Sequence, residues 1–264
     1  MAKRRNGYPR TIEKWYAREI NRFVFKWQKQ ANLAIAMIKP YVLGGTKMLQ
    51  DADNSNDPNW MHYVQQVLNL MSTSIDNVQS TQELNSLARR YVYSVDSFSA
   101  NKVKHKTGTV QIKASTIAVN PLANNTKLQE YAQAKIIENV SLINKLKGTY
   151  KQQLQSDIYR LISNGSGITD LSHDISSRTG MALRHATLIA NDQTGTILSQ
   201  IDTYRDQKAG AEKYIWRSME DGRVRPKHQE LDGEVFEYDD PNGGDDGQLP
   251  GEPINCRCYA DAVF

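Results

Sequence analysis

The sequence predicts a mainly helical α+β protein, in which long helices precede a small C-terminal antiparallel sheet. Three observations support this fold class. Up to Lys208, apolar residues recur at spacings of three and four, which is the period of a helix that buries one face. After Gly210, short alternating runs rich in aromatic and β-branched residues are typical of strands. Glycine, proline and aspartate gather between these runs, as they do in turns.

The first predicted helix covers residues 9–38 and has two stripes. The apolar stripe consists of Tyr16, Ile20, Phe23, Trp27, Ala31, Ala34 and Ile38. The basic stripe beside it consists of Arg18, Arg22, Lys26 and Lys29. Four cations on one helix face are candidates for contact with DNA phosphates or with an acidic protein surface. The alternative is a solvated face that meets no partner.

A second helical block is predicted over residues 59–99, after a polar loop at 50–58. Within this block, Ser80 and Glu83 have the spacing of a capping box, in which each side chain bonds the other residue's backbone N–H. We therefore expect a new helix to begin at Ser80.

Residues 101–121 lose the helical period and are predicted to form two short strands or an extended linker. We place a domain boundary in this segment. It separates an N-terminal helical region, residues 1–120, from a C-terminal domain, residues 121–264.

Helical periodicity returns at Thr126, which together with Gln129 offers a second capping-box start. We expect this helix to end at residues 164–167, whose sequence is NGSG. Gly148 lies inside the helix and is a candidate kink, since glycine is a poor helix former.

Two further helices are predicted before the strands. A short one covers residues 169–177, and a long one runs from Met181 to about Lys208, with Gly180 between them. Gly210 is a natural C-terminal stop.

The remaining residues are predicted to form three short strands. The first lies in residues 211–218 (AEKYIWRS), and the second follows a turn within residues 231–236. A loop rich in Gly, Pro and Asp covers 239–253, and residues 254–264 form the last strand.

The charge distribution is asymmetric although the net charge is only +4. Residues 1–40 hold ten Lys and Arg against two Asp and Glu, a balance of +8. Residues 219–264 hold four against twelve, a balance of −8. No run approaches the roughly 18 apolar residues of a membrane span, and the basic start lacks the apolar part of a signal peptide. We expect a chain without a membrane segment that is made in a cytoplasm.

His228, Cys256 and Cys258, with Asp221, are candidate metal ligands. Sulfur and imidazole suit Zn²⁺, and a hairpin would bring the two segments together. Two thiols leave the fourth ligand to Asp221, Asp232 or water. In the alternative interpretation, the thiols are small core residues and His228 bonds a backbone carbonyl.

A second polar cluster is predicted around Asp221, Arg223 and Arg225, which alternate about a turn. Arginines that grip a carboxylate would pin this turn, and Arg257 is a candidate member of the same ion-pair network. The alternative is a binding or catalytic cluster. We expect Trp216 to be a core residue.

These residues occur in an order that resembles the signature of the Mu F-like head morphogenesis family of tailed phages. The matching elements are Trp216, Asp221, Arg223, Arg225, His228, Leu231, Gly233, Asp240, Pro241, Asn255, Cys256, Arg257 and Cys258. The preceding helix matches as well through residues 189–194, IANDQT, although Asn191 stands where the family commonly has Arg. The resemblance covers residues 121–264.

The resemblance implies a minor capsid protein that is associated with the portal vertex inside the phage head. Such a protein has a structural role in head assembly and in DNA packaging or delivery. Its implied partners are the portal protein, the major capsid or scaffolding protein, and viral double-stranded DNA. We expect it to be made in the host cytoplasm and to end in the virion.

Two other functions compete with this expectation. One is a non-specific DNA-binding protein that acts in packaging or ejection. The other is a metal-dependent nuclease or a toxin-like module. Against an enzyme, the chain lacks the motifs of zinc deaminases, of serine hydrolases and of phosphate-binding glycine loops. We therefore predict no catalytic residue, no enzymatic activity, and no cofactor other than the candidate zinc.

Overall fold

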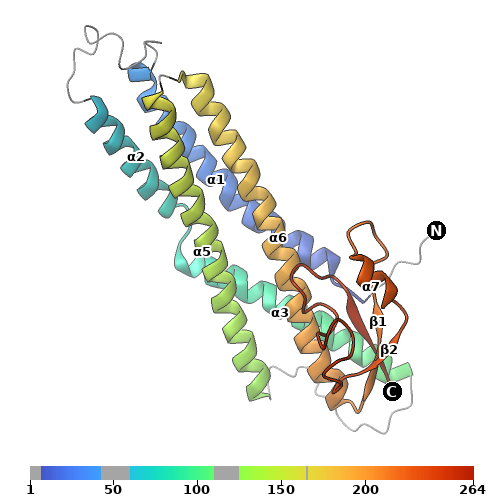
Figure 1. The fold of residues 1–264 in the computed structure, drawn as a ribbon. Coiled ribbons are helices and arrows are strands. Elements are labelled where there is room, and N and C mark those ends of the chain that lie inside the picture. Colours follow the sequence, from blue (N-terminus) through green and yellow to red (C-terminus); the bar gives the residue numbers. More distant parts are fainter. Residues whose placement is uncertain (1–6, 43–59, 110–124, 165) are drawn as a thin grey trace. The chain divides into compact units, whose positions relative to one another are not determined.

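The computed structural model describes residues 7–42, 60–109, 125–164 and 166–264, and in these ranges five long helices precede three strands and one short helix (Figure 1). The helices are α1 (Arg10–Val42), α2 (Trp60–Asp76), α3 (Thr81–Thr109), α5 (Thr126–Ser163), α6 (Ile168–Lys208) and α7 (Pro226–Glu230). The strands are β1 (Lys213–Arg217), β2 (Val235–Glu237) and β3 (Tyr259–Val263). The predicted class, α+β with predominant helix and a small antiparallel sheet, is confirmed.

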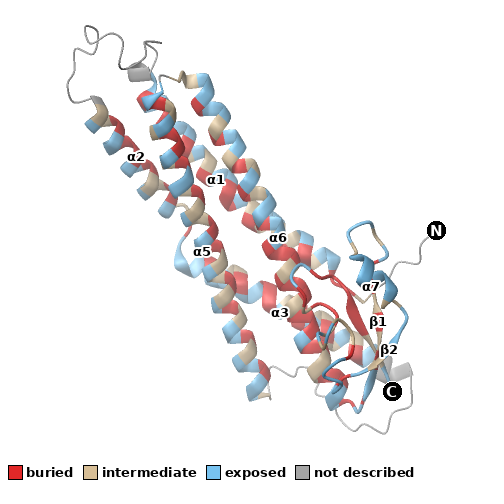
Figure 2. Ribbon diagram, in the orientation of Figure 1, coloured by how far each residue is buried: buried red, intermediate tan, exposed pale blue. Residues whose placement is uncertain are grey.

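The long helices are amphipathic, with buried and exposed positions alternating along each of them (Figure 2). All seven residues of the apolar stripe predicted for α1 are buried. None of the helices in the described ranges combines the length and the apolar character that crossing a membrane requires.

Side-chain caps mark the start of two helices. The backbone N–H of Glu83 donates to Ser80 Oγ at 3.0 Å, which confirms the predicted start of α3. At α5 the cap is Asn125 instead of the predicted Thr126, since the N–H of Leu128 donates to Asn125 Oδ1 at 3.2 Å. Asn is a stronger N-cap than Thr, and it leaves Thr126 as the first helical residue.

The two glycines that were expected to interrupt helices do not do so. Helix α5 continues through Gly148, and α6 continues through Gly180, so residues 169–177 are the first turns of α6. One glycine costs a helix only about 1 kcal/mol. Buried neighbours such as Ile175 and Ala182 hold α6 in place on both sides of its glycine.

The expectation of strands or a linker over residues 101–121 is wrong for its first part, because residues 101–109 continue α3. Val103 is fully buried there, and Lys102 forms an ion pair with Asp202 at 2.5 Å, so tertiary contacts favour the helix. The rest of that segment, the boundary at residue 120 and the loop at 50–58 lie outside the described residues.

The chain divides into two compact units, and each combines segments that are distant in the sequence. Unit 1 consists of Met1–Ala17, Asn85–Val140 and Thr187–Phe264. Unit 2 consists of Arg18–Leu84 and Ser141–Ala186. Both units draw on residues before and after residue 120, so they do not follow the predicted division into 1–120 and 121–264.

Unit 2 is a helical core built from parts of α1, α2, α5 and α6. Trp27 is fully buried, packs against Tyr150 and donates its indole N–H to Gln79 Oε1 at 3.0 Å. At the surface, Lys151 pairs with Asp76 at 2.5 Å and links α5 to α2. The large apolar side chains therefore determine how these helices pack, and ion pairs border them.

Unit 1 contains a buried polar and aromatic junction. Tyr16 stacks on Tyr91 with ring centroids 3.7 Å apart and donates to Asn139 Oδ1 at 2.9 Å. The Tyr91 hydroxyl lies 2.7 Å from that of Thr194. These contacts join α1, α3, α5 and α6 with their polar atoms satisfied, which burial requires.

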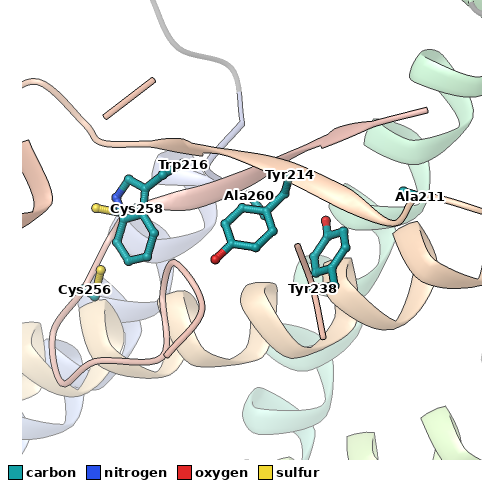
Figure 3. Close-up of a cluster of buried hydrophobic side chains, with 7 residues drawn as sticks. All are labelled: Ala211, Tyr214, Trp216, Tyr238, Cys256, Cys258 and Ala260. Atoms are coloured by element: carbon teal, nitrogen blue, oxygen red, sulfur yellow. The ribbon is translucent and has the colours of Figure 1, made fainter. Parts of the chain in front are cut away.

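The sheet of unit 1 has the strand order β2-β1-β3, and both pairings are antiparallel. Tyr214 of β1 pairs with Phe236 of β2, and Trp216 pairs with Ala260 of β3. Gly210, at φ +93°, ends the helix that leads into β1, as predicted. The buried aromatic residues of this module lie between the sheet and α6 (Figure 3).

Two aromatic residues of α1 offer a matched test of this packing. We expect Trp27→Ala to destabilise the protein by about 3–5 kcal/mol, because it leaves a cavity in the core of unit 2. Phe25→Ala should change stability by no more than about 0.5 kcal/mol, since Phe25 is 54% exposed. Urea unfolding followed by circular dichroism measures both, and equal effects would contradict the assignment of the buried face.

Candidate functional site

One wall of the candidate site is formed by strand β1, whose side chains point alternately to the two faces of the sheet. Tyr214 and Trp216 point to the buried side of the sheet, as residues two apart in a strand do. Trp216 is fully buried and meets the ring of His228 edge-on, with centroids 5.1 Å apart. Trp216 is therefore a core residue whose ring also forms one wall of the site.

Helix α7 presents His228 to this core. Pro226 stands at its start, where the fixed φ of proline suits a first helical turn. The helix was not predicted, because five residues are too short to show a helical period. It turns His228 inward, where the imidazole is 2% exposed.

The two cysteines reach His228 from the segment that leads into β3. Residues two apart in an extended chain project to the same face, so Cys256 and Cys258 both point inward while Arg257 points the other way. Both thiols are buried. The sulfur of Cys256 lies 3.5 Å from His228 Nδ1, and the sulfur of Cys258 lies 3.6 Å from the same atom.

The second imidazole nitrogen of His228, Nε2, contacts Asp245 in the loop at residues 239–253. His228 Nε2 lies 3.0 Å from Asp245 Oδ2, and Asp245 also pairs with Lys227 at 2.6 Å. An Nε2–H that donates to this carboxylate leaves Nδ1 free to face the sulfurs as an acceptor. The hydrogen bond with Cys256 raises the pKa of His228, burial lowers it, and Asp245 raises it further.

The two cysteines shift each other's pKa values in opposite directions. A hydrogen bond from Cys258 lowers the pKa of Cys256 to about 5, against the effect of burial and with help from His228. The pKa of Cys258 rises, because its proton is held by the Cys256 sulfur and because the thiol is buried. One of the two thiols is thus readily ionised, as a metal ligand must be.

The residues named as candidate ligands are therefore brought together in part. His228, Cys256 and Cys258 place their ligand atoms within 4.8 Å of one another. Asp221 instead receives two hydrogen bonds from Arg257, at 2.6 and 2.8 Å. Asp232 accepts the backbone N–H of Ser218 at 2.8 Å.

Asp221 and Arg257 form a separate ion pair on the outer side of the Cys-x-Cys segment. The hydrogen bond from Arg257 lowers the pKa of Asp221. The backbone N–H of Arg223 donates to the same carboxylate at 3.1 Å, and Arg10 of α1 approaches it at 3.7 Å. Of the arginines predicted to grip this carboxylate, Arg257 does so through its side chain, whereas Arg223 contributes only its backbone N–H and Arg225 donates to a backbone carbonyl instead.

Arg225 and Asn255 position the loop before the cysteines. Arg225 donates to the backbone carbonyl of Ile254 at 2.6 Å. Asn255 adopts φ +57°, and its N–H donates to Asp192 Oδ1 of α6 at 2.8 Å. Arg223 contributes its backbone to the network, and its side chain is exposed.

Gly233, Asp240 and Pro241 are turn residues. Gly233 has φ +95° and donates its N–H to the Trp216 carbonyl at 2.9 Å. Asp240 Oδ1 accepts the N–H of Asn242 at 2.9 Å, and Pro241 is exposed. None of these three residues contributes an atom to the His-Cys cluster.

The four residues of the basic stripe on α1, Arg18, Arg22, Lys26 and Lys29, are all exposed. Arg22 pairs with Glu19 at 2.8 Å, and Lys26 lies over the ring of Phe23. The stripe belongs to unit 2, whereas the His-Cys cluster belongs to unit 1.

Comparison with known proteins identifies the segment that carries this cluster. Residues 152–261 match the sequence model of a family described as phage Mu protein F like protein. Over these residues the chain is similar to the Mu F-like family. This match supports the predicted family, over a segment that begins later than the predicted residue 121. The similarity suggests a protein of phage head morphogenesis.

One relative of this chain is an uncharacterized protein from Haemophilus influenzae, which is 31% identical over 143 residues. This alignment covers 54% of the present chain and 32% of the relative. The chain therefore spans about a third of the length of that relative. No solved structure matches the chain.

The contacts that two residues of this segment make at the site were not predicted. Asp245 lies in an acidic loop where nothing in the spacing singles it out. Gly195 lies in the middle of α6, where a glycine without a packing role costs stability, and that cost was a usable signal. A methyl group on Gly195 would meet the Cys256 carbonyl oxygen at 2.1 Å and that of Gly251 at 3.2 Å. The absence of a side chain at Gly195 therefore lets the backbone of the Cys-x-Cys segment pack directly against α6.

Substitutions at two helical glycines test this close contact between the Cys-x-Cys segment and α6. We expect Gly195→Ala to destabilise the protein by about 1–3 kcal/mol, because the methyl group displaces backbone. Gly148→Ala in α5 meets nothing within 4 Å and should stabilise by about 0.5–1 kcal/mol, since alanine is the better helix former. Urea unfolding measures both changes. If both variants were stabilised, the close approach at Gly195 would be disproved.

Proposed function

We propose that the chain is a minor capsid protein of a tailed phage and works in head morphogenesis, docked at the portal vertex inside the head. The observation that carries this proposal is the Mu F-like match over residues 152–261. Its proposed partners are the portal protein and the major capsid or scaffolding protein.

The geometry of the His-Cys cluster supports a structural role over an enzymatic one. His228 is buried, and the cavity beside the cluster measures about 30 Å³. Sites for small molecules commonly measure about 300–1,000 Å³. A nucleic-acid backbone or a metabolite has no room at His228, so the cluster is suited to holding the fold together.

The exposed face of α1 supports a docking role. It carries the basic stripe and three exposed apolar residues, Phe25, Leu33 and Met37. Cations around apolar side chains suit an acidic partner surface, since charge guides the encounter and apolar contact stabilises the complex. We propose this face as the one that meets the portal protein.

Isolated heads provide the test. We expect mass spectrometry to detect the chain in purified heads and chemical cross-linking to join α1 to the portal protein. Replacing Arg18, Arg22, Lys26 and Lys29 by Gln should remove most of these cross-links, because the charges that guide docking are lost.

The matched control replaces four exposed cations on other helices, Arg89, Lys127, Lys145 and Arg184, by Gln and makes the same change in net charge. This control should keep its cross-links. Absence of the chain from purified heads would refute the proposal, and equal loss in both variants would refute the docking face.

A second candidate function is non-specific binding of viral double-stranded DNA during packaging or ejection. The observation that favours it is the same stripe, in which four cations recur along one exposed helix face at the spacing of helical turns. Cations so placed can neutralise successive phosphates without reading bases.

Salt dependence tests the second function. If the stripe contacts phosphates, the affinity for duplex DNA should fall steeply with salt. The Gln variant of the stripe should lower the slope of log K against log salt by about 3.6, because four cations are lost at about 0.9 per phosphate. Fluorescence anisotropy measures this slope, and the control variant on the other helices should retain it. An unchanged slope in the stripe variant would exclude this DNA contact.

A further inference from the structure

We propose that His228, Cys256 and Cys258 bind a Zn²⁺ ion, which clamps α7 to the segment leading into β3. This inference goes beyond the proposed function and does not depend on it. The three residues come from two segments, and their ligand atoms lie within 4.8 Å of one another in the buried module.

Both cysteine sulfurs lie close to the same nitrogen atom of His228. His228 Nδ1 has Cys256 Sγ at 3.5 Å and Cys258 Sγ at 3.6 Å. A neutral imidazole nitrogen offers only one lone pair and can accept one good hydrogen bond. Nδ1 and the two sulfurs are three atoms that can each donate a lone pair, and they face one another in a buried space as the ligands of one shared cation do.

The distances fit a tetrahedral zinc ion. Zinc bonds sulfur at about 2.3 Å and histidine nitrogen at about 2.0–2.1 Å. At a tetrahedral angle, these lengths place sulfur and nitrogen about 3.6 Å apart. The two observed separations of sulfur from Nδ1, 3.5 and 3.6 Å, agree with this value.

The surroundings of the ligands have the features of a metal site. Asp245 holds the other nitrogen of His228 at 3.0 Å, an arrangement that orients a metal-binding imidazole. The buried indole N–H of Trp216 has no oxygen or nitrogen acceptor, and its nitrogen lies beside the Cys258 sulfur (Figure 3). A donor aimed at a thiolate stabilises the negative charge that zinc requires there.

Solvent can supply the fourth ligand. The two carboxylates considered for this role have other partners, since Asp221 binds Arg257 and Asp232 binds the N–H of Ser218. The cavity of about 30 Å³ beside the cluster is lined by all three ligand residues. A water molecule needs about 10–15 Å³ of such space, so the cavity can hold one.

The ion would stabilise the part of the module with the least backbone pairing. Helix α7 has five residues and β2 has three, so neither is stable alone. A zinc ion joins α7 to the Cys-x-Cys segment, which itself rests on Gly195 of α6. Small modules commonly use such a metal in place of a larger core.

Metal content is the direct measurement. The full chain is purified without a metal-binding tag, kept reduced, and incubated with ZnCl₂ before gel filtration and elemental analysis. We expect about one zinc per chain. With CoCl₂ instead of zinc, we expect sulfur-to-cobalt charge-transfer bands and the intense visible bands of tetrahedral cobalt.

Three variants and one control locate the site. Cys256→Ser and Cys258→Ser should each lose the zinc and the charge-transfer bands. Asp245→Asn should keep the ligands but weaken zinc affinity about 10–100-fold, because the imidazole is held less firmly. His185→Ala removes an exposed histidine of α6 and should retain full zinc content.

Circular dichroism accompanies each variant, so loss of metal is interpreted only where the helical signal is kept. If a cysteine variant fails to fold, Asp245→Asn and the cobalt spectrum of the native chain decide the matter. Zinc well below one per chain after incubation with ZnCl₂, or cobalt bands without sulfur-to-metal charge transfer, would overturn the proposal.

Discussion

The burial of one face of the three-stranded sheet on α6 is the constraint on which the C-terminal module depends. The sheet is too small to be stable alone, since β2 has only three residues. Tyr214 and Trp216 fill the space between sheet and helix, and Tyr238 donates to Asp206 of α6 at 3.0 Å. Gly195 lets the last segment approach the helix backbone. Without α6, nothing would hold His228 and the cysteines in register.

Because successive side chains of an extended segment point to opposite sides, the cysteines and Arg257 of the Cys-x-Cys segment belong to different clusters. Cys256 and Cys258 face His228, while Arg257 points to the opposite side of the segment and binds Asp221. One three-residue segment thus contributes to two clusters, one on each of its sides. Both clusters hold the Cys-x-Cys segment in place.

Much of the architecture followed from local physics. Helical periodicity predicted the long helices, the Ser80 cap predicted the start of α3, and the change of period after Gly210 predicted the strands. The predictions failed where local and tertiary preferences disagree. Gly180 does not break α6, because buried residues on both sides hold the helix together. Helix α7 is too short to leave a periodic signal.

The sequence by itself determined the fold class, the ordered motif of the Mu F-like segment, and the residue types of the candidate site, since period and residue chemistry are written in the chain. Only the tertiary structure decided which of those residues meet. It placed His228 with the two cysteines and gave Asp221 to Arg257. It also brought in Asp245 from a loop whose spacing indicates nothing. The physical reason is that contacts between distant segments depend on how the sheet packs on α6, and no local pattern encodes that packing.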